Sequence, residues 1–195
     1  MPGCVGVLAL QGAFREHIVS LERLRVPTRE VRGLKDMDGV DALVIPGGES
    51  TTMGKLLTDW EMLGPVRARI EAGMPVYGSC AGLILLCREI ENSSQPRLGV
   101  LDAVVRRNAF GRQVDSFETM LDLPVLARPG EDNPPFPAVF IRAPVIVDVG
   151  PQVEVLAEVD GQAVAVRQGH VLATSFHPEL TADSRLHRYF LEMCA

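Results

Sequence analysis

Cysteine is scarce in this sequence, and the four cysteines that are present stand far apart. They occupy positions 4, 80, 87 and 194, without a C-x-x-C pair or a dense framework. Such spacing gives no disulfide scaffold, and it favours a reduced, cytoplasmic protein.

Long apolar runs and basic patches are also missing. No stretch is long enough to span a bilayer. The apolar start, MPGCVGVLALQG, lacks a basic n-region and a cleavage site, so we expect a first buried strand there and not a signal peptide. The net charge is −6 and Lys and Arg form no dense cluster, which argues against nucleic-acid binding. We therefore expect neither a membrane nor a nucleic-acid partner.

What is present suits one globular domain over residues 1–195. Hydrophobic residues make up 47% and charged residues 23% of the chain, an ordinary globular balance. A chain of this length buries enough apolar surface to fold without a metal or disulfide. No repeat, low-complexity segment or linker divides it.

Strand and helix patterns alternate through the first half. Short apolar runs predict strands at residues 4–10, 28–32, 42–45 and from 76. Helical spacing predicts helices within 11–24, 51–57, 65–71 and 83–91. This alternation is typical of a parallel sheet wrapped by helices.

The second half reads as additional strands, some of them antiparallel. Strand-like pieces cover residues 100–108, 117–123, 138–147, 153–169 and 170–176. Asp160-Gly161 signals a hairpin, and the proline-rich stretch 128–137 predicts a surface loop. Thr181 can cap a final helix that carries Leu186, Tyr189, Phe190 and Met193 on one face.

A cysteine stands at the tip of the tightest junction in the chain. Residues 78–82, GSCAG, follow an apolar strand and open a helix, the arrangement of a nucleophile elbow with sulfur in place of oxygen. The helix N-terminus favours a Cys80 thiolate, and the N–H of Ala81 can face a developing oxyanion. The alternative is a small apolar cysteine in a glycine-rich turn. Cys4, Cys87 and Cys194 are interpreted as structural.

His177 is the histidine best placed to activate a thiol. It ends an apolar strand, and Pro178 favours an extended backbone at His177, so His177 and Glu179 can point to one side. The carboxylate can then hold one imidazole nitrogen and leave the other for Cys80. A plain turn with a solvated Glu179 is the alternative.

The other three histidines lack such a setting. His17 and His187 fall within amphipathic helices and are expected at the surface or in packing. His170 begins a strand with no acidic neighbour.

A second glycine loop, VIPGGESTTMGK at 44–55, follows the strand 42–45. It does not match the spacing of a phosphate loop. Gly47 and Gly48 can expose backbone N–H groups at the same strand edge as Cys80, which would complete a two-donor oxyanion hole with Ala81. The alternative is a β-turn before a helix capped by Ser50 or Thr51.

Three motifs in this order, PGGES, GSCAG and HPE, are similar to those of class I, triad-type glutamine amidotransferases. Longer stretches resemble the glutaminase subunits of pyridoxal phosphate synthase nearly end to end: 6–17, 45–53, 107–118, 140–144 and 175–181. The resemblance implies a flavodoxin-like three-layer sandwich, mostly parallel with added antiparallel strands. One departure is Ser79, where threonine is expected.

The resemblance also implies roles for individual residues. Cys80 would be the nucleophile, with His177 and Glu179 completing a triad and Gly48 and Ala81 forming the oxyanion hole. Glutamine would be bound by Gly47, Gly48, Glu49, Arg107, Ile141 and Arg142. Gln11 would lie beside the oxyanion loop, near a partner surface.

The implied reaction is hydrolysis of L-glutamine through a thioester. The ammonia would pass to a barrel-shaped synthase subunit in a hetero-oligomeric complex that makes pyridoxal phosphate. The glutaminase chain itself would need no metal and no cofactor. Rival interpretations are another amidotransferase or a γ-glutamyl hydrolase with the same triad, and a cysteine-bearing redox or binding module.

Overall fold

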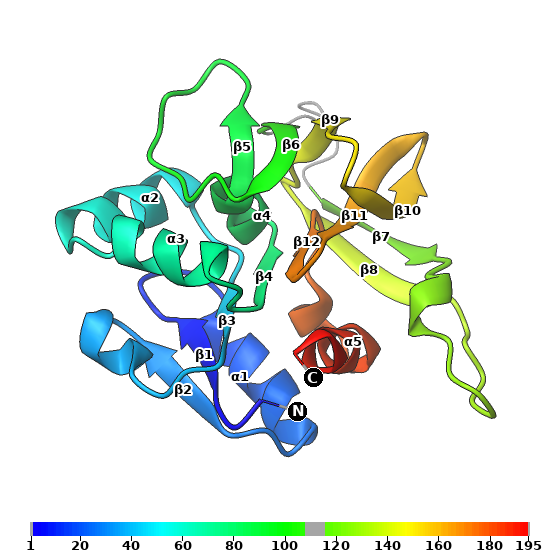
Figure 1. Ribbon diagram of the computed structural model, residues 1–195. Coiled ribbons are helices and arrows are strands. Elements are labelled where there is room, and N and C mark those ends of the chain that lie inside the picture. The colour runs from blue at the N-terminus through cyan, green and yellow to red at the C-terminus, as the bar shows by residue number, and fades with distance from the viewer. Residues whose placement is uncertain (1, 108–115, 195) are drawn as a thin grey trace.

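A seven-stranded sheet crosses the middle of the molecule in the computed structural model (Figure 1). The structure describes residues 2–107 and 116–194. The strands from β12 to β2 run parallel, and β11 and β10 extend the sheet antiparallel. Their spatial order is β10 (Glu154–Val159), β11 (Gln162–Gln168), β12 (Val171–Thr174), β4 (Val76–Ser79), β3 (Ala42–Ile45), β1 (Val5–Leu8) and β2 (Thr28–Val31).

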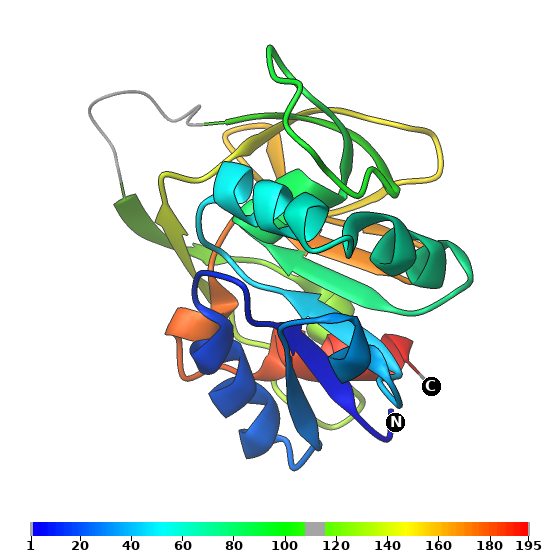
Figure 2. The same cartoon turned by 90° about the vertical axis from the view of Figure 1, so that its left-hand side faces the viewer.

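Helices cover both faces of this sheet and give the molecule three layers (Figure 2). One face carries α1 (Phe14–Arg23) and α5 (Arg185–Met193); the other carries α2 (Ser50–Asp59), α3 (Leu63–Glu71) and α4 (Ala81–Leu86). In β3, Ala42 and Val44 face the α1–α5 cluster, whereas Leu43 and Ile45 face the opposite one. The strands are therefore buried on both sides, which confirms the flavodoxin-like sandwich expected from the sequence.

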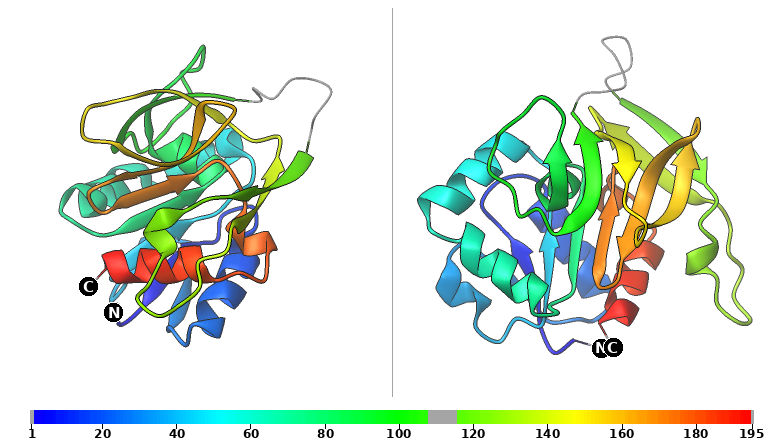
Figure 3. Two further views of the ribbon diagram at one scale, coloured as in Figure 1. Left: turned by 90° about the vertical axis from the view of Figure 1, so that its right-hand side faces the viewer. Right: turned by 45° about the horizontal axis from the view of Figure 1, so that its top comes forward.

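Two smaller sheets sit beside the central one (Figure 3). One has three strands, in the order β5, β6 and β9, and the other pairs β7 with β8. Three short 3₁₀ turns complete the secondary structure of the described residues, at Leu34–Met37, Pro124–Leu126 and Pro178–Leu180. The five strands are β5 (Cys87–Ile90), β6 (Leu101–Arg106), β7 (Ser116–Leu121), β8 (Phe136–Ile141) and β9 (Val145–Val149).

The helix predicted at 83–91 is wrong in its second half. The helix α4 stops at Leu86, and the next residues form β5, which pairs in parallel with β6. A short apolar run such as LILLC fits either element, and here the hydrogen bonds offered by β6 decide between them.

Three other boundaries differ from the sequence prediction. The final helix begins at Arg185, because the hydroxyl of Thr181 donates to the carbonyl of Pro178 and closes a turn there. The loop predicted at 128–137 ends earlier, because the buried Phe136 starts β8. The piece predicted at 138–147 is split into β8 and β9, with Arg142 between them at φ 42°. The hairpin at Asp160-Gly161 is confirmed between β10 and β11.

None of the helices in the described part of the chain is both long and apolar enough to cross a bilayer.

The order of the strands in the central sheet indicates where a functional site lies. From β1, the chain moves to one side for β2 and to the other for β3, β4 and β12. Open α/β sheets bind ligands outside the carboxyl ends of their strands near such a reversal. Gln11, Gly48, Cys80 and His177 all follow strands at that edge.

Candidate active site

Cys80 lies where β4 ends and α4 begins, in a strained backbone conformation. Its φ and ψ are 47° and −100°, values that cost a non-glycine residue about 1–3 kcal/mol. Its N–H donates to the carbonyl of Thr174 on the neighbouring strand at 2.8 Å, and its own carbonyl accepts from Ile84 at 3.2 Å. These bonds hold the turn, so the strand–cysteine–helix junction predicted from the sequence is present.

A glycine at 82 lets this turn pack tightly against β3. A Cβ added there would collide with the carbonyl oxygen of Ile45 and stand 3.0 Å from its carbonyl carbon, so any larger residue would force the backbone to shift. The first turn of α4, with its unpaired N–H groups, is thereby brought next to the loop that follows β3.

His177 and Glu179 are paired just after β12. Nδ1 of His177 lies 2.7 Å from Oε1 of Glu179, and both residues are buried. The route to this contact differs from the extended one predicted. Pro178 starts a 3₁₀ turn that runs to Leu180, and this turn folds the carboxylate back onto the imidazole.

The charges of this pair are set by burial and by each other. Burial opposes protonation of His177, but its hydrogen bonds and charge interactions with Cys80 and Glu179 prevail and raise its pKa to about 10. Burial likewise favours the neutral form of Glu179, but the interactions with His17 and His177 prevail and lower its pKa. At neutral pH the pair is an imidazolium beside a carboxylate.

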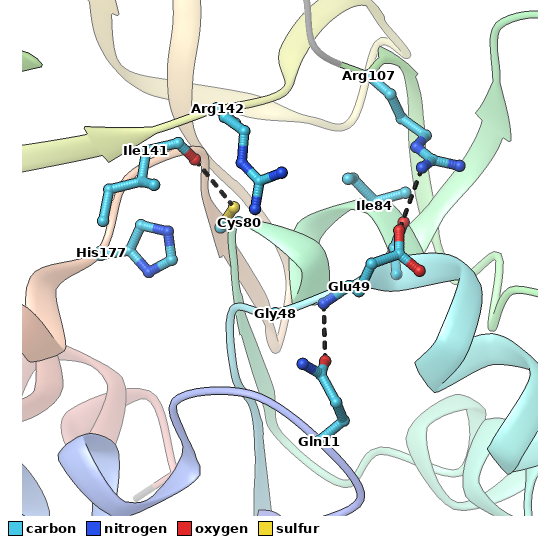
Figure 4. A pocket seen from close by; sticks show the side chains of 10 residues that line it. Gln11, Gly48, Glu49, Cys80, Ile84, Arg107, Ile141, Arg142 and His177 are labelled. Carbon is cyan, nitrogen blue, oxygen red and sulfur yellow. Dashed lines mark hydrogen bonds and ion pairs between the residues drawn. The ribbon is translucent and has the colours of Figure 1, made fainter. Parts of the chain in front are cut away.

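The thiol and the imidazole meet at one wall of a cavity of about 310 Å³ (Figure 4). Cys80 Sγ lies 4.0 Å from the carbonyl oxygen of Ile141. The cavity is large enough for a free amino acid. Its lining residues are Gln11, Gly48, Glu49, Ser50, Cys80, Ile84, Arg107, Ile141, Arg142 and His177.

The loop after β3 is fixed from the side of β1. The N–H of Ala13 donates to the carbonyl of Gly47 at 3.0 Å, and the N–H of Glu49 donates to Oε1 of Gln11 at 2.7 Å. Because the peptide is trans, the N–H of Gly48 points away from Ala13. Gln11 thus supports the loop that carries the expected oxyanion donor.

Arg107 reaches into the cavity from the end of β6 and contacts Glu49. Its guanidinium lies 3.2 Å from Oε1 of Glu49, 2.9 Å from Oγ1 of Thr51 and 2.7 Å from Oε1 of Gln95. Glu49 also caps α2, since its carboxylate accepts from the N–H of Thr52, so neither Ser50 nor Thr51 is the cap. The cavity therefore holds an acidic and a basic group side by side, as recognition of a zwitterion requires.

Several expected residues meet at this site, and others do not line it. Ile141 and Arg142 face the cavity from the end of β8. Ala81 is buried at the start of α4 next to Cys80, and Gly47 lies beside His177 and Cys80 without lining the cavity. Within the predicted stretch 107–118, residues 108–115 lie outside the described part.

Sequence reasoning missed the role of Gln95 and the contact of two packing histidines with the expected triad. Gln95 is nearly buried and holds Arg107. His17 and His187 are fully buried, with Nδ1 of His17 3.0 Å from Nε2 of His187. Nε2 of His17 lies 3.3 Å from Oε2 of Glu179, so these packing residues also touch the expected triad.

Burial makes His187 a source of acid sensitivity. Burial, and then the neighbouring His17, lower its pKa to about 3. The unfolded chain binds a proton near pH 6.5 and the folded chain does not, so stability is lost as pH falls below that value. His187→Gln keeps an N–H donor for His17 but cannot titrate. Between pH 7 and 4.5 we expect it to lose about 3 kcal/mol less unfolding free energy than the wild type.

Urea unfolding of both chains at the two pH values measures this difference. His170→Gln is a matched control, because His170 is a partly buried histidine immediately before β12 that bonds the carbonyl of Ile70 and makes no hydrogen bond with His17 or Glu179. Equal acid slopes for wild type and His187→Gln would contradict the prediction.

No group of three His, Cys, Asp or Glu side chains within residues 2–107 and 116–194 is arranged to hold a metal ion.

Comparison with known proteins places this site in a family context. The model of the SNO glutamine amidotransferase family matches residues 7–195. The pyridoxal 5'-phosphate synthase subunit PdxT of Moorella thermoacetica is 58% identical over 189 residues, covering 97% of this chain and 98% of that protein. The PdxT subunit of Thermus thermophilus is 57% identical over 195 residues, covering 99% and 98%.

Comparison with solved structures gives the same result. A crystal structure of a glutamine amidotransferase superposes with a TM-score of 0.91 at 54% identity, covering 97% of this chain and 98% of that one. The PurLQS structure from Thermotoga maritima superposes with a TM-score of 0.71 at 16% identity over the full length of both chains, which is a likeness of fold.

Proposed function

Because the chain belongs to the SNO glutamine amidotransferase family, we propose that it hydrolyses L-glutamine to L-glutamate and ammonia and supplies the ammonia for synthesis of pyridoxal 5'-phosphate. The observation that carries this proposal is the single cavity in which Cys80 and His177 stand opposite the paired Arg107 and Glu49. A thiol and an imidazole supply acyl-transfer chemistry, and the charged pair suits the head group of a free amino acid.

Binding is the first step. The α-carboxylate of glutamine pairs with the guanidinium of Arg107, and the α-ammonium pairs with the carboxylate of Glu49. The substrate thus exchanges partners with an ion pair that already exists at 3.2 Å. Gln95 and Thr51 keep the guanidinium in place during the exchange. The carboxamide then extends toward Cys80, beside Ile141 and Arg142.

Acylation follows with a balanced proton count. The Cys80 thiolate attacks the carboxamide carbon, and the N–H groups of Gly48 and Ala81 stabilise the oxyanion by about 3 kcal/mol each. The His177 imidazolium donates its proton to the departing nitrogen, which leaves as ammonia. The product on the enzyme is a γ-glutamyl thioester, and Glu179 has kept His177 oriented throughout.

Hydrolysis of the thioester completes the cycle. The now neutral His177 takes a proton from a water molecule, the water oxygen attacks the thioester carbon, and the sulfur leaves as a thiolate. Glutamate is released and His177 is an imidazolium again. This scheme uses no metal and no cofactor.

The ammonia is handed to a synthase partner. Ammonia that escapes to bulk water near neutral pH is protonated and loses its nucleophilicity, so transfer inside a complex preserves it. The partner in this proposal is a barrel-shaped synthase subunit in a hetero-oligomer. The compartment is the cytoplasm, which keeps Cys80 reduced; all four cysteines are free thiols.

An isotope experiment tests this function. The chain is mixed with the synthase subunit, its sugar phosphate substrates, amide-¹⁵N glutamine and a tenfold excess of unlabelled ammonium. We expect the product to carry mostly ¹⁵N, and glutamate release to be faster than without the synthase. Glutamate release at the same rate with and without the synthase, together with a product that carries no ¹⁵N, would instead indicate a stand-alone hydrolase.

A further inference from the structure

A fully buried polar cluster lies behind the carboxylate of Glu179. It is made by His17 of α1, His187 of α5 and Ser79 of β4, three residues that are 0% exposed. Nε2 of His17 lies 2.9 Å from Oγ of Ser79 and 3.3 Å from Oε2 of Glu179, and its Nδ1 lies 3.0 Å from Nε2 of His187. Side chains from three separate elements therefore meet at His17, which contacts the carboxylate, and none of the three lines the cavity.

The second oxygen of Glu179 depends on His17. Oε1 is used by His177, whereas Oε2 has no hydrogen-bond partner among the described residues; the side-chain nitrogen beside it is Nε2 of His17, at 3.3 Å. A lone pair of His17 facing this buried carboxylate oxygen would be costly, so the hydrogen of His17 belongs on Nε2, where it bonds the hydroxyl of Ser79 and lies next to Oε2.

The same accounting fixes the protons of the two histidines. A neutral imidazole carries one N–H, so with the hydrogen on Nε2 the Nδ1 of His17 is an acceptor. The atom facing it is Nε2 of His187, which must be the donor. The remaining nitrogen of His187, Nδ1, is then an unprotonated acceptor, and it has no hydrogen-bond partner among the described residues.

His17 is held neutral by its surroundings. Burial is the largest influence and lowers its pKa; Glu179 opposes this, and the imidazolium of His177 reinforces it. The other groups facing it are Glu16 on its own helix, His187 on α5 and the Tyr77 ring on β4, whose centroid is 5.9 Å away.

We propose that His17 is a positioning residue for the reaction: its Nε2–H steadies Oε2 of Glu179, so that Oε1 stays aimed at His177 and the free imidazole nitrogen stays aimed at Cys80. His187 serves this role by holding His17 in the required tautomer. The inference rests on the proposed function, since the reaction that it supports is glutamine hydrolysis. The proposal adds His17 and His187 to the residues that support the reaction, although neither contacts the substrate.

Two substitutions at 17 separate positioning from packing. His17→Leu fills the site but removes the N–H, whereas His17→Gln places an amide N–H near the position of Nε2. For His17→Leu we expect kcat of glutamate release, measured with the synthase present, to fall about 10- to 100-fold with KM changed less than about threefold. For His17→Gln we expect kcat within about fivefold of the wild type.

The resting protein supplies a readout that does not depend on activity. In ¹⁵N NMR the imidazole of His177 should titrate near pH 10 in the wild type and in His17→Gln. In His17→Leu it should titrate at a lower pH, because a mobile carboxylate stabilises the imidazolium less. The basic limb of the kcat/KM profile should move in the same direction.

Leu191→Ala is the control for lost stability. Leu191 is buried in α5 and lies in the same core cluster as Leu21 of α1. Its truncation should lower the melting temperature while leaving the titration of His177 unchanged.

Each outcome decides the proposal. A His17→Leu variant with wild-type kcat and an unmoved His177 titration overturns it. The proposal is also overturned if His17→Gln loses as much kcat as His17→Leu. It is overturned as well if His17→Leu loses no more kcat than Leu191→Ala when the two variants have the same melting temperature. A wild-type chain that releases no glutamate even with the synthase would refute the proposed function, while the NMR titrations would still report whether His17 orients the pair.

Discussion

Replacing Cys80 with alanine should reduce glutamate release from L-glutamine by about 10³-fold or more, to the limit of detection. In the proposed mechanism the sulfur of Cys80 forms the thioester, and the described lining of the cavity contains no second thiol. Cys80→Ser should behave similarly, because a serine hydroxyl stays protonated where a thiol ionises. The amide-hydrolysis rate of the purified chain with its synthase partner measures the effect.

Cys87→Ala is the matched control for this loss. Cys87 is fully buried at the start of β5, and burial raises its pKa far above the usual range, so it is an inert packing residue. Its truncation should cost about 1–2 kcal/mol of stability and leave the rate unchanged. Labelling with a glutamine-like diazoketone, followed by peptide mapping, should place the adduct on Cys80 alone. A Cys80→Ala variant with full activity, or a label on another residue that glutamine competes away, would show that the nucleophile is misassigned.

Adding a single methyl group at position 47 should lower kcat by about 100-fold. A Cβ on Gly47 would stand 2.8 Å from Nδ1 of His177, closer still to its Cε1, and 3.4 Å from Cβ of Cys80. The imidazole is nearly buried and bonded to Glu179, so it can yield only by breaking that bond. Gly47→Ala therefore displaces the proposed base without substituting any residue of the triad.

Gly64→Ala serves as the comparison for this variant. Gly64 lies in α3 with nothing within 4 Å of an added Cβ, so alanine should raise stability by up to about 1 kcal/mol and keep the wild-type rate. Steady-state kinetics and thermal unfolding of both variants test the contrast. If Gly47→Ala turned over glutamine as fast as Gly64→Ala, the imidazole would not occupy the place that the mechanism requires.

Local patterns were sufficient to predict the central layers. Unbroken apolar runs at β1, β3 and β4 are fully buried strands, and helical spacing located α1, α2 and α3. Patterns failed where pairing decides the outcome. The residues of β5 are strand because β6 lies beside them, and that information is not local.

The candidate site divides in the same way. GSCAG and HPE carry their chemistry in adjacent residues, so the sequence could nominate Cys80, His177 and Glu179. The burial of His17 could have been predicted from the sequence, because His17 lies on the same helical face as Phe14 and Leu21. Its contact with Glu179 could not be foreseen, since that contact joins residues far apart in the chain through the packing of α1 against the last 3₁₀ turn.

The order of the central sheet also governs when the chain becomes reactive during its synthesis. The elbow with Cys80 is complete after about 86 residues, but the imidazole follows β12, which inserts beside β4 only after residue 174 has emerged from the ribosome. A nascent chain of intermediate length thus carries the Cys80 thiol without the His177 imidazole that would accept its proton. In the proposed mechanism, a chain that ends before His177 cannot hydrolyse glutamine, and ammonia is first released once the segment after β12 is in place.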